Sequence, residues 1–135
     1  MVAAHSRLFS ELEQLAFDVL AHSRDELDAM IGASQRRFDS VTIRQSNAGP
    51  TIAIDGDSAT VLVGPHATSC ESSLVSNVAH ESVHLHLTSG AGGWPNGLEE
   101  GFAVFFELRA VANHYGQAER QRHLDHLPKT YLRAA

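Results

Sequence analysis

The chain has 135 residues, 43% of them hydrophobic, and a formal net charge of −6, which predicts one domain over residues 1–135 with a modest apolar core. The acidic balance and the lack of any basic block argue against a nucleic-acid-binding surface. No run approaches 18 apolar residues, no signal peptide is visible, and Cys70 is the only cysteine, so we expect a cytoplasmic protein with no membrane association and no disulfide framework.

The first segment of the chain has the periodicity of a helix. Its apolar residues recur three and four positions apart, as on the buried face of an amphipathic helix: Leu8, Phe9, Leu12, Leu15, Ala16, Val19 and Leu20. Ser23 and Glu26 have the spacing of a capping box. We therefore predict that a second helix begins at Ser23 and buries Leu27, Met30 and Ile31.

After residue 40 the spacing of the apolar residues changes from the 3.6-residue period of a helix to the two-residue period of a strand. Val41 and Ile43 alternate with Thr42 and Arg44, which predicts a half-buried strand. Residues 51–54 and 59–63 predict two more strands, joined across Asp55-Gly56-Asp57-Ser58 as a hairpin. These patterns predict an α+β fold in which a small antiparallel sheet packs on helices.

Residues 64–71 predict a loop, and Ser72 or Ser73 is the expected N-cap of the next helix. His66 and Cys70 lie four residues apart in this loop, a spacing that two metal ligands could also have. No second pair of Cys or His residues completes such a site. A buried thiol and a surface histidine are therefore the favoured interpretation.

The next helix is apolar on almost every side, as expected of a helix at the centre of a domain. It contains the pentapeptide His80-Glu81-Ser82-Val83-His84. Residues four apart share one face of a helix, so the two imidazoles can bind one zinc ion. Glu81 lies about 100° around the helix axis, where it can accept a proton from a zinc-bound water. His86, about 240° from His80, faces away from such an ion.

A second motif, Glu100-Gly101-Phe102-Ala103, follows this pentapeptide, with Trp94 before it and Glu107 after it. H-E-x-x-H followed by a helix that bears E-G-x-A resembles the gluzincin metallopeptidases of the thermolysin and aminopeptidase N types. The resemblance covers residues 74–107 and is closer to the aminopeptidase N type than to the thermolysin type. It implies a zincin-like (gluzincin) core, a zinc cofactor, and peptide or protein substrates. It further implies that Glu100 is the third zinc ligand beside His80 and His84, with Glu81 as the general base.

The helix that carries the second motif is predicted to run to residue 115 and to stop at Gly116. On this helix Glu100 shares a face with Glu107, whereas Glu99 lies nearer to the bulky phenylalanines. We therefore expect Glu107 to orient a zinc ligand without binding the metal. Glu99 is expected to face solvent or a helix N-terminus.

The chain departs from the gluzincin pattern in two places. Val104 stands where thermolysin-type enzymes often have an aspartate that orients a zinc-bound imidazole. Only 28 residues follow Glu107, whereas gluzincins normally have a helical subdomain there that supplies an oxyanion-stabilising Tyr or His. We expect the segment 117–135 to form short helices that fold over the zinc. Five residues could supply the oxyanion donor, none within a recognisable motif: His114, Tyr115, His123, His126 and Tyr131.

Two functions are consistent with these patterns. The first is zinc-dependent peptide hydrolysis, with an extended substrate paired to the edge of strand 59–63. The alternative is a non-catalytic zincin-fold domain, in which zinc ties the helices together and the chain regulates or binds a partner. Glu81 favours the peptidase, because a purely structural site needs no base, and the short C-terminal part favours the alternative. The sequence leaves the cleavage preference and the oligomeric state open.

Overall fold

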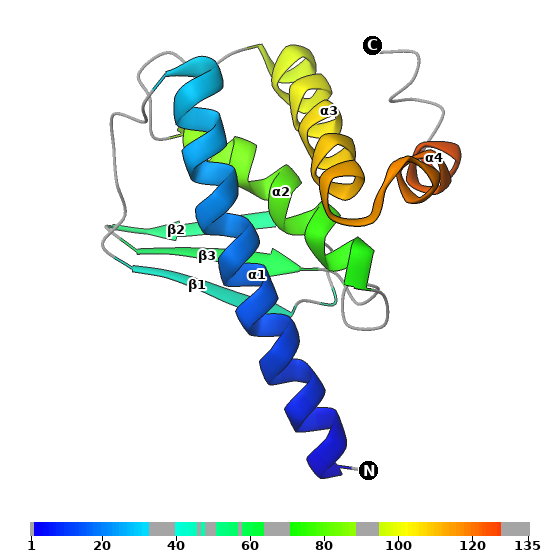
Figure 1. Ribbon diagram of the computed structural model, residues 1–135. Coiled ribbons are helices and arrows are strands. Elements are labelled where there is room, and N and C mark those ends of the chain that lie inside the picture. Colours follow the sequence, from blue (N-terminus) through cyan, green and yellow to red (C-terminus); the bar gives the residue numbers. More distant parts are fainter. Residues whose placement is uncertain are drawn as a thin grey trace.

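The computed structural model describes residues 2–32, 40–45, 47, 51–56, 58–63, 71–88 and 95–127. These residues form, in order, α1 (Val2–Ile31), β1 (Ser40–Gln45), β2 (Thr51–Asp55), β3 (Ser58–Val63), α2 (Glu71–Thr88), α3 (Asn96–Tyr115) and α4 (Gln117–Asp125). The described part of the chain is thus mainly helical, with one small sheet (Figure 1). None of the described helices has the length and apolar character needed to cross a bilayer.

Helix α1 is continuous from Val2 to Ile31, so the predicted break at Ser23 is wrong. Ser23 is buried within the helix. A serine and a glutamate three residues apart fit a helix interior as well as a capping box, and no Gly or Pro interrupts residues 2–31. The helix ends instead at Gly32, whose φ of 93° lies in the left-handed region that glycine adopts without strain.

The sheet is mixed, which corrects the expectation of an antiparallel sheet. Its strand order is β1-β3-β2, in which β2 and β3 form the expected antiparallel hairpin while β1 lies parallel to β3. β3 is the most apolar of the three strands, and its Ala59 and Val61 are buried, which suits the central place in a sheet. Because both edges of β3 are paired, the expectation that a peptide substrate adds to residues 59–63 is wrong.

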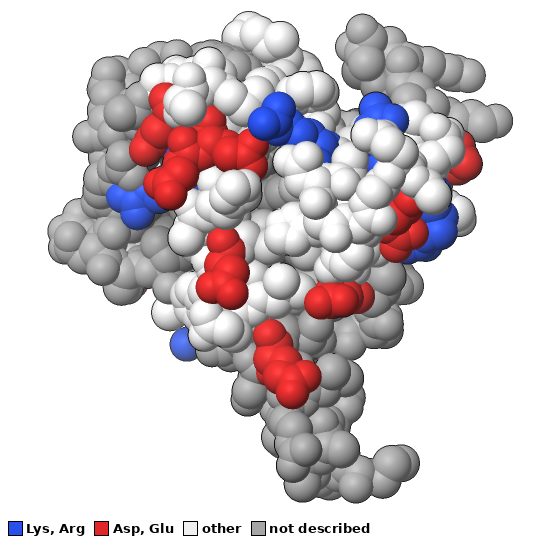
Figure 2. Space-filling model, in the orientation of Figure 1, with Lys and Arg blue, Asp and Glu red and all other residues white. Residues whose placement is uncertain are grey.

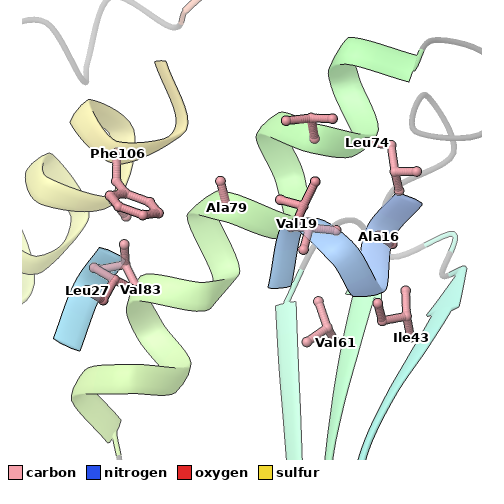
Figure 3. Close-up of a cluster of buried hydrophobic side chains, with 12 residues drawn as sticks. Ala16, Val19, Leu27, Ile43, Val61, Leu74, Ala79, Val83 and Phe106 are labelled. Carbon is pink, nitrogen blue, oxygen red and sulfur yellow. The ribbon is translucent and has the colours of Figure 1, made fainter. Parts of the chain in front are cut away.

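Helix α2 packs against the sheet and against both α1 and α3. Helices α1 and α2 cover one face of the sheet, and α3 packs against α2 (Figure 1). Figure 3 shows Ile43 and Val61 of the sheet below Val19 of α1, and Val83 of α2 near Phe106 of α3. Complete burial of a Val or Phe side chain stabilises a fold by about 1.5–3 kcal/mol. The core therefore holds α2 in a fixed position relative to α3.

Polar contacts fix the C-terminal end of α1 against α2 and α3. Acidic side chains gather over this half of α1, with basic side chains beside them (Figure 2). The Arg109 Nη2 of α3 donates to Glu26 Oε2 of α1 at 2.8 Å. The His86 Nε2 of α2 donates to the Gly32 carbonyl oxygen at 2.8 Å. His86 therefore faces α1, away from His80, as predicted.

The predicted ends of α2 and α3 are confirmed in part. Helix α3 stops before Gly116, whose φ of 95° suits glycine. Helix α2 begins at Glu71, so Ser72 lies inside the helix and is not its N-cap. The alternative ligands His66 and Cys70, together with Trp94 and Tyr131, lie outside the described residues.

Candidate metal centre

Helix α2 carries a line of polar side chains on the side that faces α3 and α4. Ser72, Ser76, His80 and His84 recur at four-residue intervals, so they follow one another along one side of the helix. Each of the four is hydrogen-bonded to a glutamate of α3 or α4. The line runs along a helix whose apolar side chains are buried in the core: Leu74, Val75, Val78, Ala79 and Val83.

The two histidines of the pentapeptide direct their Nε2 atoms toward a common point. The Nε2 atoms of His80 and His84 lie 3.3 Å apart. Glu100 of α3 reaches the same point, with Oε1 at 2.6 Å from His80 Nε2 and Oε2 at 3.1 Å from His84 Nε2. Within the described part of the chain, these three residues are the group of His, Cys, Asp or Glu side chains that could hold a metal ion.

The other nitrogen of each ring is bonded to a glutamate of its own. His80 Nδ1 lies 2.7 Å from Glu107 Oε1, and His84 Nδ1 lies 2.6 Å from Glu99 Oε2. A carboxylate can only accept these bonds, so Nδ1 donates a proton in both rings, and a neutral ring would then offer the lone pair of Nε2 to a cation. Partners of this kind fix the tautomer and the orientation of metal-binding histidines. We call His80, His84, Glu99, Glu100 and Glu107 the metal centre.

The donor atoms of the metal centre are of the types that bind zinc. Two imidazole nitrogens and one carboxylate are a ligand set found in catalytic zinc sites. With Zn–N bonds of 2.0–2.1 Å and tetrahedral angles, the ligand atoms should lie about 3.3 Å apart. The two Nε2 atoms have this separation, whereas the Glu100 oxygens lie 2.6 and 3.1 Å from them, within hydrogen-bonding distance. No described Lys or Arg forms a salt bridge with the three glutamates. The three converging side chains could therefore hold a cation.

Glu81 is buried beside the metal centre without belonging to the ligand group. Its side chain follows His80 on α2, and the residue is only 5% exposed. Burial raises the Glu81 pKa, because desolvation penalises the carboxylate. The nearby charges of His80 and His84 act in the opposite direction, and those of Glu100 and Glu107 add to the increase. Glu81 is thus a carboxyl group whose affinity for a proton is increased.

The carboxylates of the metal centre favour a positive charge on His80. Burial alone would lower the pKa of this imidazole. The hydrogen bond and charge of Glu107, followed by the charges of Glu100 and Glu81, outweigh burial and raise the His80 pKa. The same negative field that attracts a proton would attract a metal cation.

Glu99 was expected to face solvent or a helix N-terminus; the first alternative is wrong, and the second agrees with its place in the first turn of α3. Its side chain is about as exposed as that of His84, at 20% and 19%, and accepts the His84 Nδ1 hydrogen bond. Glu107, which was predicted to orient a zinc ligand, is hydrogen-bonded to His80; its role towards a metal stays a prediction. A usable signal was present in the sequence: two histidine ligands need two partners, and two further glutamates flank Glu100 on the same helix.

The described candidates for an oxyanion donor lie away from Glu100. His114 and Tyr115 are exposed at the far end of α3, about 21 Å of helix rise from Glu100. His126 Nδ1 donates to the Arg122 carbonyl oxygen within the C-terminal segment itself. His123 contacts Ser72, which precedes His80 by two turns of α2, about 12 Å.

Helix α4 is held at the N-terminal end of α2 by a second polar cluster. Ser72 Oγ donates to Glu119 Oε2 at 2.7 Å and lies 3.0 Å from His123 Nε2. Arg122 Nη2 donates to the same Glu119 oxygen at 2.9 Å. We call Ser72, Glu119, Arg122 and His123 the α4 cluster. The tail was expected to fold over the proposed zinc ligands. Its described part instead lies at Ser72, near the start of α2, so this expectation is wrong for those residues.

Comparison with known proteins returns no matching family model, no matching curated protein and no matching solved structure.

Proposed function

We propose that the chain is a zinc-dependent peptidase with a minimal gluzincin-like core. The observation that carries the proposal is the convergence of the His80, His84 and Glu100 donor atoms beside the buried Glu81. Catalytic zinc sites have three protein ligands and an open fourth position, whereas structural sites have four protein ligands. A cytoplasmic location is part of the proposal, because Cys70 is the only cysteine.

Glu81 is the proposed general base. When bound, zinc would polarise the carbonyl group of the scissile peptide bond and lower the pKa of a water molecule. Glu81 then accepts the proton of the attacking water and passes it to the leaving amine.

The proposed substrates are extended peptides or proteins. The two edge strands of the sheet are β1 and β2, and β2 contacts α2, which carries the proposed ligands. An extended substrate would therefore pair with the open edge of β2. The edge of β2 thus replaces residues 59–63 as the proposed place where a substrate pairs with the sheet.

The alternative function is a non-catalytic zinc-stabilised domain that regulates or binds a partner. One observation favours it: the three ligands come from both α2 and α3, so that an ion would tie these helices together. Glu81 separates the two functions, since an ion that only joins helices requires no base.

The test is the Glu81→Gln variant, with Glu71→Gln as its control. Glu71 is an exposed glutamate of the same helix. We expect wild type and both variants to bind one zinc ion, and Glu81→Gln to lose peptide hydrolysis by about 10²–10⁴-fold. Metal analysis and cleavage of a peptide library check both points.

Each other outcome has a definite meaning. Cleavage by Glu81→Gln at the wild-type rate would refute the role of Glu81. A zinc-loaded wild type that cleaves no peptide would favour the non-catalytic domain. A wild type that takes up no zinc would contradict both functions.

A further inference from the structure

The Ser76 hydroxyl supports the metal centre from one turn before His80. Ser76 is 5% exposed, and its Oγ donates to Glu107 Oε2 at 2.5 Å. The other oxygen of the same carboxylate, Oε1, accepts the bond from His80 Nδ1 at 2.7 Å. One glutamate of α3 therefore joins two side chains of α2 that are four residues apart.

We propose that Ser76 is a positioning residue, which fixes the Glu107 carboxylate so that His80 presents Nε2 to a metal ion. The terminal torsion of a glutamate is broad, so a carboxylate with a single partner can rotate. Two donors, one on each oxygen, fix its plane. Because the Glu107 side chain is only 13% exposed, loss of the Ser76 hydroxyl would leave one of its oxygens poorly solvated.

The two imidazoles differ in the support that they receive. The partner of His80, Glu107, lies in the interior of α3 and is also bonded to Ser76 of α2. The partner of His84, Glu99, lies in the first turn of α3, where helices fray most readily. The His80 half of the metal centre is thus fixed from both helices, and Ser76 supplies the additional bond.

The experiment compares Ser76→Ala with Ser82→Ala. Ser82 is a second buried serine of α2, but its Oγ donates to the backbone oxygen of Val78, so its loss leaves the metal centre intact. We expect Ser76→Ala to weaken zinc binding by about threefold to tenfold, less than the 10–100-fold loss typical of a direct partner of a ligand. Ser82→Ala should bind zinc as wild type does. Chelator competition measures the affinity.

Nitrogen NMR of the His80 ring gives a readout that a general loss of stability would not produce. In the metal-free wild type, at a pH high enough to make the His80 ring neutral, we expect the tautomer with its proton on Nδ1. Ser76→Ala should show a mixture of both tautomers, and Ser76→Thr, which keeps the hydroxyl, should restore the wild-type signal. In a Glu107→Ala background, Ser76→Ala should change neither the zinc affinity nor the tautomer further, because Ser76 acts on His80 only through the Glu107 carboxylate.

Three results would overturn the proposal: wild-type affinity and tautomer in Ser76→Ala, an equal loss in Ser82→Ala, or an undiminished effect of Ser76→Ala in the Glu107→Ala background. The inference rests on the zinc site of the proposed function and not on peptidase activity. A protein that binds zinc without cleaving peptides therefore still tests Ser76 by affinity. If no zinc binds, the proposed function fails, and the ring signals of the metal-free protein still decide whether Ser76 orients His80.

Discussion

Helix α2 meets two polar clusters that contain the same kinds of side chain, and only one of them gathers possible metal ligands. The α4 cluster joins Ser72 to a glutamate, an arginine and a histidine of α4. The metal centre joins His80 and His84 to three glutamates of α3. Both contain histidine nitrogens and carboxylates within hydrogen-bonding distance of α2, so residue type alone does not separate them.

The two clusters differ in whether an arginine side chain is bonded to their glutamates. In the α4 cluster Arg122 bonds to Glu119, and this bond, with that of Ser72, lowers the Glu119 pKa to about 2. No described Lys or Arg makes such a bond to the glutamates of the metal centre. In the described residues, the group of His and Glu side chains that could hold a metal ion is therefore the one without an arginine partner.

The largest expected effect comes from removing one carboxylate from each cluster. Glu100→Ala should lower zinc affinity by orders of magnitude, because one of three ligands is lost. Glu119→Ala, a matched change in the α4 cluster, should leave zinc affinity unchanged. Titration of both variants against a zinc chelator checks this. Similar losses in the two variants would mean that the clusters are not separate.

A smaller effect is expected from the direct partner of His84. Glu99→Gln should weaken zinc binding by about 10–100-fold, because the ring loses the carboxylate that fixes its tautomer. Calorimetry with zinc can measure the loss, with Glu11→Gln on the exposed side of α1 as the control. A change of only a few-fold would show that the bond between His84 and Glu99 contributes little to the centre.

The smallest effect concerns pH and the α4 cluster. The Glu119 pKa is lowered in the folded chain, to about 2, so its stabilising contribution is fully present above the unfolded value near 4.5 and is lost as pH falls through about 2. Urea unfolding of chelator-treated wild type and Glu119→Gln should differ slightly at pH 5.5, and the difference should shrink toward pH 2. A difference that grows on acidification would contradict the assignment of this ion pair.

The sequence predicted those parts of the site that depend on local helix geometry. The spacing of His80 and His84 places both on one side of any helix, and Gly116 ends α3 in the structure as in the prediction. Glu99 was missed because the direction of a side chain within a helix pair depends on how the helices are rotated against each other. Glu99 and Glu100 differ by about 100° around the axis, and α3 presents both to α2.

The errors in the fold have a similar origin. The strand pattern predicted β2 and β3 as a hairpin, but it could not show that β3 lies between β1 and β2, because strand order depends on pairing between distant segments. The Ser23 pattern was ambiguous in a different way, since a three-residue spacing occurs both at caps and within helices. Only packing, which buries Ser23, decided between them.

The hydrogen bonds of the metal centre connect segments that are close in the chain. The bonds of Glu107 to Ser76 and His80 span 31 and 27 residues, and that of Glu99 to His84 spans 15. By contrast, the Arg109–Glu26 pair spans 83 residues. Short spans cost little loop-closure entropy and form early in folding. The centre can therefore assemble from a single helical hairpin, and an ion captured at that stage would stabilise the α2–α3 pair before α1 docks against it.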